Sequence, residues 1–155
     1  MRLTSIFTTV AISAIILSNL VLAEVPKKFK VATIKKAVGY QTNLIATFNN
    51  NMRLCVNHLT SDKPTVSSSA CSAAITDIES MNLTSEKVNY LKSLSYSNRA
   101  ISKYLAGDNN GALTDLTSAT LIDSNSITIN NLALIKNISK NTELSQALKS
   151  SEHSD

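Results

Sequence analysis

Residues 93–126, SLSYSNRAISKYLAGDNNGALTDLTSATLIDSNS, decide the fold of this chain. Apolar and small residues recur every three or four positions on both sides of Ala106-Gly107-Asp108, which is the spacing of amphipathic helices. Gly107 suits the left-handed position just past a helix end, and Asp108 suits the cap of the helix that follows. The stretch therefore predicts two short helices joined by a tight turn, with the rest of the chain packed against them.

The same spacing predicts helices in both directions from this stretch. The expected helical segments are 28–38, 40–59, 67–81, 86–106, 109–122 and 127–138, with a last short helix from Thr142 to about Leu148. Pro64 favours a chain break after the second of them, and Thr84 or Ser85 can cap the fourth. The chain has only three Gly, two Pro and no Trp, which argues against a β-sandwich or barrel. We expect one all-α domain over residues 24–149 and a disordered tail over 150–155.

The first 23 residues have the features of a secretory signal peptide. Arg2 is followed by an apolar run from Ile6 to Leu22, and small residues precede Glu24. The alternative is a membrane anchor, but the strongly apolar part begins only at Val10 and is shorter than the ~20 residues that a membrane span needs. Cleavage before Glu24 predicts a periplasmic or secreted protein without stable membrane insertion.

The two cysteines, Cys55 and Cys71, form an even set in a chain expected to be exported. This combination predicts one disulfide. The alternatives are two buried thiols or a metal pair. A metal site needs further ligands, and His58 and His153 are poorly placed to supply them, so we expect no metal and no other cofactor.

The charge of the chain is +4 in total and is unevenly distributed. Residues 24–60 contain six basic residues against Glu24 alone. Such a region could contact anionic lipid or an acidic surface, although a solvated helix face is the simpler interpretation. Nucleic acid is not an expected partner, because the chain carries an export signal and its basic residues are not interleaved with aromatic ones.

A set of residues within 93–126 matches a known repeat pattern. It comprises a large aromatic residue at the fourth position, a small residue after Asn-Arg, a Gly-Asp turn, small-large-small spacing in the second helix, and a terminal Asp-x-Asn: Tyr96, Asn98-Arg99-Ala100, Gly107-Asp108, Ala112, Leu116, Ala119 and Asp123-Ser124-Asn125. This set resembles a tetratricopeptide repeat, a helix-turn-helix unit of 34 residues.

Outside 93–126 the match is weaker. Cys71, Ala74 and Ile75 resemble part of a preceding second helix, and Asn131-Leu132-Ala133 resembles the start of a following first helix, one residue out of phase. The resemblance implies antiparallel helix pairs stacked as a short tetratricopeptide-like right-handed solenoid. The alternative is a plain helical bundle that matches by chance.

The resemblance also implies how the cysteines face one another. In the repeat register Cys71 takes the large position of a second helix, and Cys55 takes the small position of the first helix of the same pair. These positions face each other where the helices cross. A disulfide requires Cα atoms ~4.4–6.8 Å apart, which a close crossing allows, so the bridge is expected to tie helix 40–60 to helix 67–81.

The function implied by the resemblance is a non-enzymatic module that binds an unidentified protein or peptide. The binding groove would be lined by first-helix residues, namely Leu94, Ser97, Asn98, Ile101, Tyr104 and Leu105. The alternative for these residues is that a neighbouring helix covers them. A second hypothesis is a helical carrier that holds a small apolar ligand in a cavity between its helices.

An enzyme is not expected. Only His58 and His153 could act as bases near neutral pH, and His153 falls in the predicted tail. His58 has no identifiable nucleophile or orienting carboxylate in the sequence, so the residues of a catalytic site are missing. Asp77 and Glu79 are too close in sequence to share one helix face.

Overall fold

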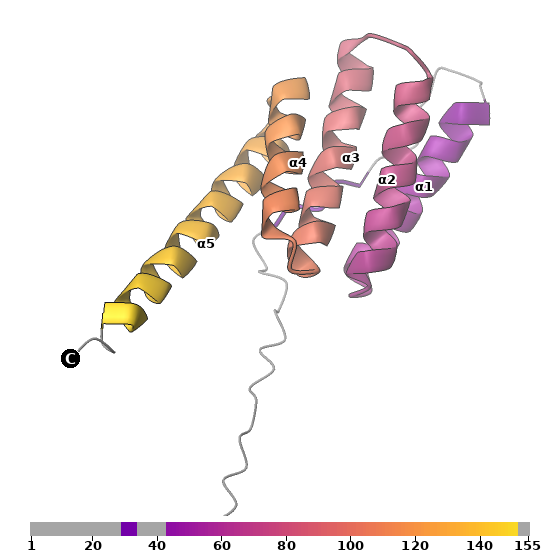
Figure 1. Cartoon of the computed structure of the whole chain (residues 1–155). Coiled ribbons are helices and arrows are strands. Elements are labelled where there is room, and N and C mark those ends of the chain that lie inside the picture. Colours follow the sequence, from indigo (N-terminus) through magenta and orange to yellow (C-terminus); the bar gives the residue numbers. More distant parts are fainter. Residues whose placement is uncertain (1–28, 34–42, 152–155) are drawn as a thin grey trace, which may run out of the picture.

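The computed structural model describes residues 29–33 and 43–151, with side chains up to residue 146. The predicted signal peptide and its cleavage site lie outside the described residues. The described chain forms five helices and no strand, which confirms the all-α prediction for this part (Figure 1): α1 (Asn43–Thr60), α2 (Pro64–Ser80), α3 (Glu86–Leu105), α4 (Asn109–Ile122) and α5 (Ser126–Ser151).

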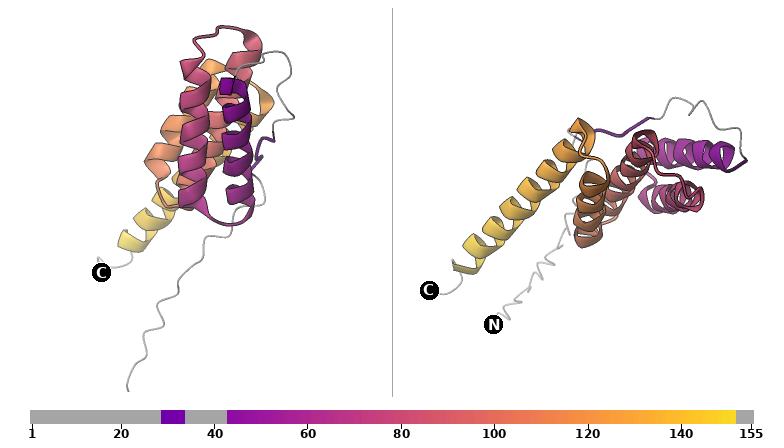
Figure 2. Two further views of the ribbon diagram at one scale, coloured as in Figure 1. Left: turned by 90° about the vertical axis from the view of Figure 1, so that its right-hand side faces the viewer. Right: turned by 90° about the horizontal axis from the view of Figure 1, so that it is seen from above.

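The five helices form two layers. Each helix packs mainly on its neighbour in the chain, and α3 also touches both α1 and α5. Viewed from above, α1, α3 and α5 lie along one side and α2 and α4 along the other (Figure 2). The extended segment 29–33 lies against the free face of the α1, α3 and α5 layer. The central helix α3 therefore contacts every other helix and the extended segment.

The boundaries of the central helices follow from local sequence signals. The hydroxyl oxygen of Ser85 accepts a hydrogen bond from the Val88 amide at the start of α3, at 3.2 Å. The Asp108 carboxylate accepts one from the Gly111 amide at the start of α4, at 2.8 Å. Between them Gly107 adopts φ +86°, a region that glycine enters at low cost. The predictions for these two helices and their turn are confirmed.

The predicted helix over 28–38 is wrong for its described part, because residues 29–33 are extended. Their backbone groups are hydrogen-bonded to side chains of α3 and α5, which replaces the bonds of a helix. The rest of that segment lies outside the described residues. Tertiary contacts have here overridden a weak local preference for helix.

The predicted break before Thr142 is also wrong. α5 runs without interruption to Ser151, into the first residues of the expected tail, and residues 152–155 lie outside the described part. Thr142 does not cap a new helix, because its hydroxyl donates to the carbonyl of Ile138 one turn earlier, at 3.0 Å. This bonding mode satisfies a threonine within a helix. No glycine or proline interrupts the segment.

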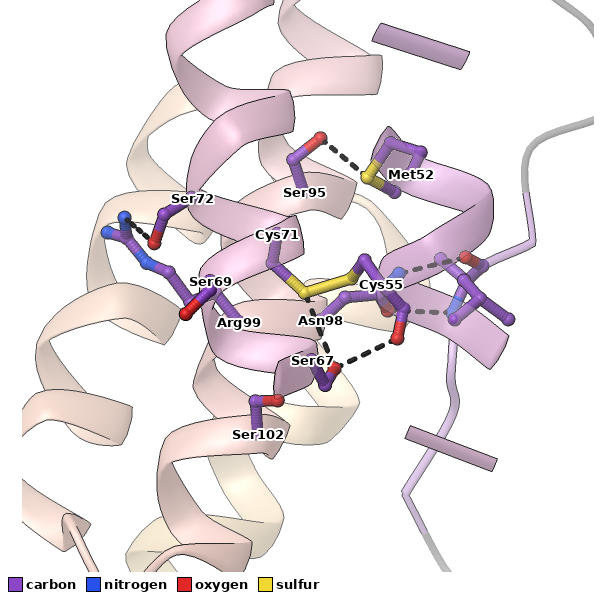
Figure 3. The surroundings of a disulfide bond; sticks show 12 residues. Met52, Cys55, Ser67, Ser69, Cys71, Ser72, Ser95, Asn98, Arg99 and Ser102 are labelled. Carbon is purple, nitrogen blue, oxygen red and sulfur yellow. Dashed lines mark hydrogen bonds between the residues drawn. A yellow bond between two sulfur atoms is a disulfide. The ribbon is translucent and has the colours of Figure 1, made fainter. Parts of the chain in front are cut away.

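A disulfide between Cys55 and Cys71 joins α1 to α2, as predicted (Figure 3). It lies in the larger of the two core clusters that the described residues form. The Cα atoms are 4.9 Å apart and both cysteines are fully buried. Beside the bridge, the Ser67 hydroxyl donates to the Cys55 carbonyl at 2.8 Å. A second cluster contains Ala100, Ala112, Leu116 and Ile135, and it joins α3, α4 and α5.

Removal of the disulfide by Cys55→Ala/Cys71→Ala should lower the free energy of unfolding by about 3 kcal/mol, because the bridge closes a loop of 16 residues. Urea unfolding of wild type and variant, with and without reductant, checks this. Reductant should shift the wild-type midpoint and leave the variant unchanged. Two alkylated cysteines in the unreduced, denatured wild type would contradict the bridge.

Ala112→Leu should lower the free energy of unfolding by ~1–3 kcal/mol, because Ala112 is fully buried in the second cluster and extra methyl groups must displace packed neighbours. Ala133→Leu on the exposed face of α5 is the matched control and should change stability by less than ~0.5 kcal/mol. Equal melting temperatures for the two variants would contradict the prediction, because they would show that the core around Ala112 has room for a leucine side chain.

Candidate functional site

The most unusual feature of the described structure is the way that two asparagine side chains hold residues 29–33. Asn98 projects from α3 and Asn131 from α5, and both are fully buried. Each binds the backbone of one residue of the extended segment through a donor and an acceptor. We call this pair the asparagine clamp.

Asn98 binds the backbone of Ala32. Its Oδ1 accepts from the Ala32 amide at 2.9 Å, and its Nδ2 donates to the Ala32 carbonyl at 2.9 Å. Figure 3 shows Asn98 beside the disulfide. A side-chain amide offers the same donor and acceptor as a peptide group, so Asn98 takes the place of a neighbouring β-strand.

Asn131 binds Lys30 in the same way. Its Oδ1 accepts from the Lys30 amide at 3.0 Å, and its Nδ2 donates to the Lys30 carbonyl at 3.1 Å. The Nδ2 group also donates to the Ser97 hydroxyl oxygen at 3.0 Å. This third bond links the clamp across α3 and α5 and fixes the orientation of the Asn131 amide.

The clamp contacts alternate residues of the segment. In an extended chain the backbone groups of residues i and i+2 point to the same side, so Lys30 and Ala32 both face the helices. The two clamped residues are one β-repeat apart, or ~6.8 Å. The clamp therefore recognises an extended backbone and makes no use of the side chains at those residues.

The side chains of the segment differ in burial. The Phe29 ring lies 5.3 Å from the Tyr104 ring, centroid to centroid, at an interplanar angle of 57°. Val31 is half-buried against the larger core cluster, and Ala32 is only 3% exposed. Lys30 and Thr33 are exposed. An aromatic, an aliphatic and a small residue are thus enclosed, while two side chains point to solvent.

The structure places the six predicted groove residues in different surroundings. Asn98 holds the segment, Ser97 supports Asn131, and Tyr104 contacts Phe29. Leu94 and Ile101 are buried, and Ile101 belongs to the larger core cluster, against which the half-buried Leu105 packs.

Sequence reasoning missed the role of Asn131 and the extended segment itself. Asn131 follows Asn98 by 33 residues, close to the length of the repeat that 93–126 resembles. Its place at the start of the weak C-terminal match was therefore a usable signal. Its helix is positioned locally by Asn125, whose Oδ1 accepts from the amides of Ile127 and Thr128 at 3.0 and 3.2 Å.

Two cations of α3, Arg99 and Lys103, bind a carboxylate of α4. Arg99 forms a bidentate pair with Asp115 of α4, at 2.7 and 2.8 Å, and Lys103 binds the same carboxylate at 2.9 Å. The Asp115 side chain is 4% exposed. Its hydrogen bonds raise the pKa of Arg99. Arg99 and Lys103 are therefore engaged in the α3–α4 contact, which leaves the clamp surface without these charges.

A second polar group joins α2 to α3 on the same side of the molecule as Arg99. Lys92 binds Glu79 at 2.8 Å, and its hydrogen bond lowers the pKa of that carboxyl. The Tyr96 hydroxyl donates to Glu79 at 3.2 Å, and burial and the adjacent carboxylate raise the pKa of Tyr96. Glu79 and Tyr96 therefore serve the contact between α2 and α3, which accounts for both pKa shifts.

No three His, Cys, Asp or Glu gather within the described ranges in a way that could hold a metal ion. Asp77 accepts a hydrogen bond from Asn51 at 2.8 Å and Glu79 binds Lys92, so the two carboxylates serve different contacts. None of the described helices is long and apolar enough to span a membrane.

A hollow of about 510 Å³ continues from the end of the extended segment along α1. It is open to solvent and includes Thr33 at one end. Three asparagines and an arginine contribute to its wall, together with smaller and apolar residues: Thr33, Ala46, Asn49, Asn50, Met52, Arg53, Val56 and Asn57. The surface of α1 is therefore hollowed next to Thr33, at the end of the extended segment.

Asp115→Asn should lower the free energy of unfolding by about 3 kcal/mol, because it leaves the partly buried cations Arg99 and Lys103 without a counter-charge. Glu143→Gln, an exposed change of the same kind on α5, is the control and should have little effect. Urea unfolding at neutral pH measures both. A stability loss below that of the control would assign no role to the ion cluster.

Comparison with known proteins gives no significant match: no family model, no curated protein and no solved structure matches the chain. The interpretation of the asparagine clamp therefore depends on its own geometry.

Proposed function

We propose that this chain is a non-enzymatic peptide-binding module that holds a partner in extended conformation along the α1, α3 and α5 layer. The asparagine clamp is the observation that carries this proposal. Four hydrogen bonds to the backbone of two alternate residues are a recognition mode for an extended peptide, in which main-chain bonds give affinity and pockets give specificity.

The fold that we propose behind this function is a short tetratricopeptide-like solenoid. The contacts of α3 with α1 and α5 support it, because first helices of successive repeats pack side by side in such an array. The 33-residue spacing of the two clamp asparagines and the complete burial of Ala100 and Ala112 support it as well. Two weakly matching pairs would flank the repeat 93–126.

We further propose that the module acts in the periplasm or outside the cell. The Cys55–Cys71 disulfide fits an exported protein. With cleavage before Glu24, five residues, 24–28, would precede the clamped segment. The segment would then lie near a free N-terminus, and every described helix would follow it in the chain.

The alternative of a carrier for a small apolar ligand has less support. The hollow beside α1 is open, and Asn49, Asn50 and Arg53 contribute polar groups to its wall. Apolar ligands prefer enclosed and predominantly apolar cavities. The clamp itself offers polar groups matched to a peptide backbone.

Selection of random displayed peptides tests the proposal. The mature chain carrying Ala32→Arg, which leaves no room for its own segment, should select binders. Asn98→Ala/Asn131→Ala in that background should weaken their binding about 30-fold or more, because four backbone hydrogen bonds are lost.

Asn110→Ala/Asn137→Ala changes two exposed asparagines and is the matched control. Circular dichroism melting confirms that each variant is folded before binding is measured. A failure to select any peptide would overturn the proposal. Peptides that bind the clamp variant and the control equally well would place the binding surface elsewhere on the molecule.

A further inference from the structure

We infer that residues 29–33 are a resident stand-in for the partner, and that the clamp accepts in their place a peptide with the pattern aromatic, any, aliphatic, small. This inference rests on the proposed function and adds the sequence class of the ligand and the competitor that controls access. It follows from how the described structure encloses each residue of the segment.

The backbone requirement comes from the spacing of the clamp. Asn98 and Asn131 use the amide and the carbonyl of Ala32 and Lys30, and the backbone of Val31 faces the other way. A ligand must therefore be extended over the three residues that replace Lys30, Val31 and Ala32. It must also have a free N–H at the positions of Lys30 and Ala32, which excludes proline at both.

The side-chain requirement comes from burial. The first position, held by Phe29, lies against the Tyr104 ring, and aromatic pairs at this separation contribute beyond their buried area. The third position, held by Val31, packs against the larger core cluster. The fourth position, held by Ala32, is buried with 3% of its surface exposed, so a larger side chain there must displace packed neighbours. The second position, held by Lys30, is exposed and accepts any residue except proline, whose missing N–H would leave Asn131 without its donor.

Exchange of the segment is compatible with the rest of the fold. The segment precedes α1 in the chain, while the disulfide and the contacts among α1 to α5 hold the two core clusters. Phe29 and Val31 are only partly buried against those clusters. The resident segment lowers the apparent affinity for a free peptide in proportion to the fraction of molecules in which the clamp is filled.

Fluorescence anisotropy with a labelled peptide of residues 28–34, KFKVATI, provides the test. Its affinity for the mature chain with Ala32→Arg should exceed that for wild type at least about tenfold, since the variant cannot refill its own clamp. Ala32→Pro, which removes the amide that Asn98 binds, is a second variant with the same expected result. If both variants fail to fold, the segment is an integral part of the fold and the inference is overturned.

N-methylated peptides give the sharpest control. N-methylation at the position of Lys30 or of Ala32 removes a clamped N–H and should weaken binding about tenfold. The same modification at the position of Val31 should change it less than about threefold, because that N–H faces away from the clamp. Equal losses at all three positions would overturn the two-residue spacing.

Substitutions in the peptide test the pattern. Ala32→Leu in the peptide should weaken binding at least about tenfold, whereas Lys30→Glu should leave it unchanged within about twofold. If selected peptides depend on Asn98 and Asn131 but ignore the pattern, this inference fails and the proposed function stands. Wild-type dimers in light scattering that disappear with Ala32→Arg would instead identify the occupant as the segment of a second copy and overturn the inference.

Discussion

The structure depends on the rule that a buried backbone group must be hydrogen-bonded. A helix satisfies its own backbone, but an extended segment pressed against helices has no strand beside it to do so. Asn98 and Asn131 supply the missing partners, and the segment in turn satisfies two buried amides that would otherwise be costly. Among the described residues no buried side-chain nitrogen or oxygen lacks a partner. Segment and asparagines therefore stabilise each other.

Local sequence was sufficient for the helices around the centre of the chain. Ser85, Gly107 and Asp108 act within one turn of their own position, so their capping roles can be read without knowledge of the fold. The pairing of Cys55 with Cys71 was also within reach, because the sequence contains only these two cysteines. These features explain why the extents of α3 and α4 were predicted closely.

The candidate site was only partly predictable, because its determinants are remote in sequence. Five residues are too few for apolar spacing to separate helix from strand, and the segment is held by partners 66 and 101 residues away. Asn98 was named as a groove residue, but nothing in its neighbours indicates a buried side chain bound to backbone. Asp115 could not be recognised as the common partner of Arg99 and Lys103 before the helix crossing was known.

The distance along the chain between the segment and its anchors has a consequence for folding order. Lys30 is among the first residues of the described chain, whereas Asn131 belongs to the last helix. Loop closure over such separations is slow compared with the local pairing of α1 with α2 or of α3 with α4. During synthesis from the N-terminus, the bonds between Lys30 and Asn131 must wait until α5 has emerged. Complete docking of residues 29–33 is thus a late folding step, because Lys30 gains its partner only with the last described helix, whereas Asn98 on α3 is available earlier.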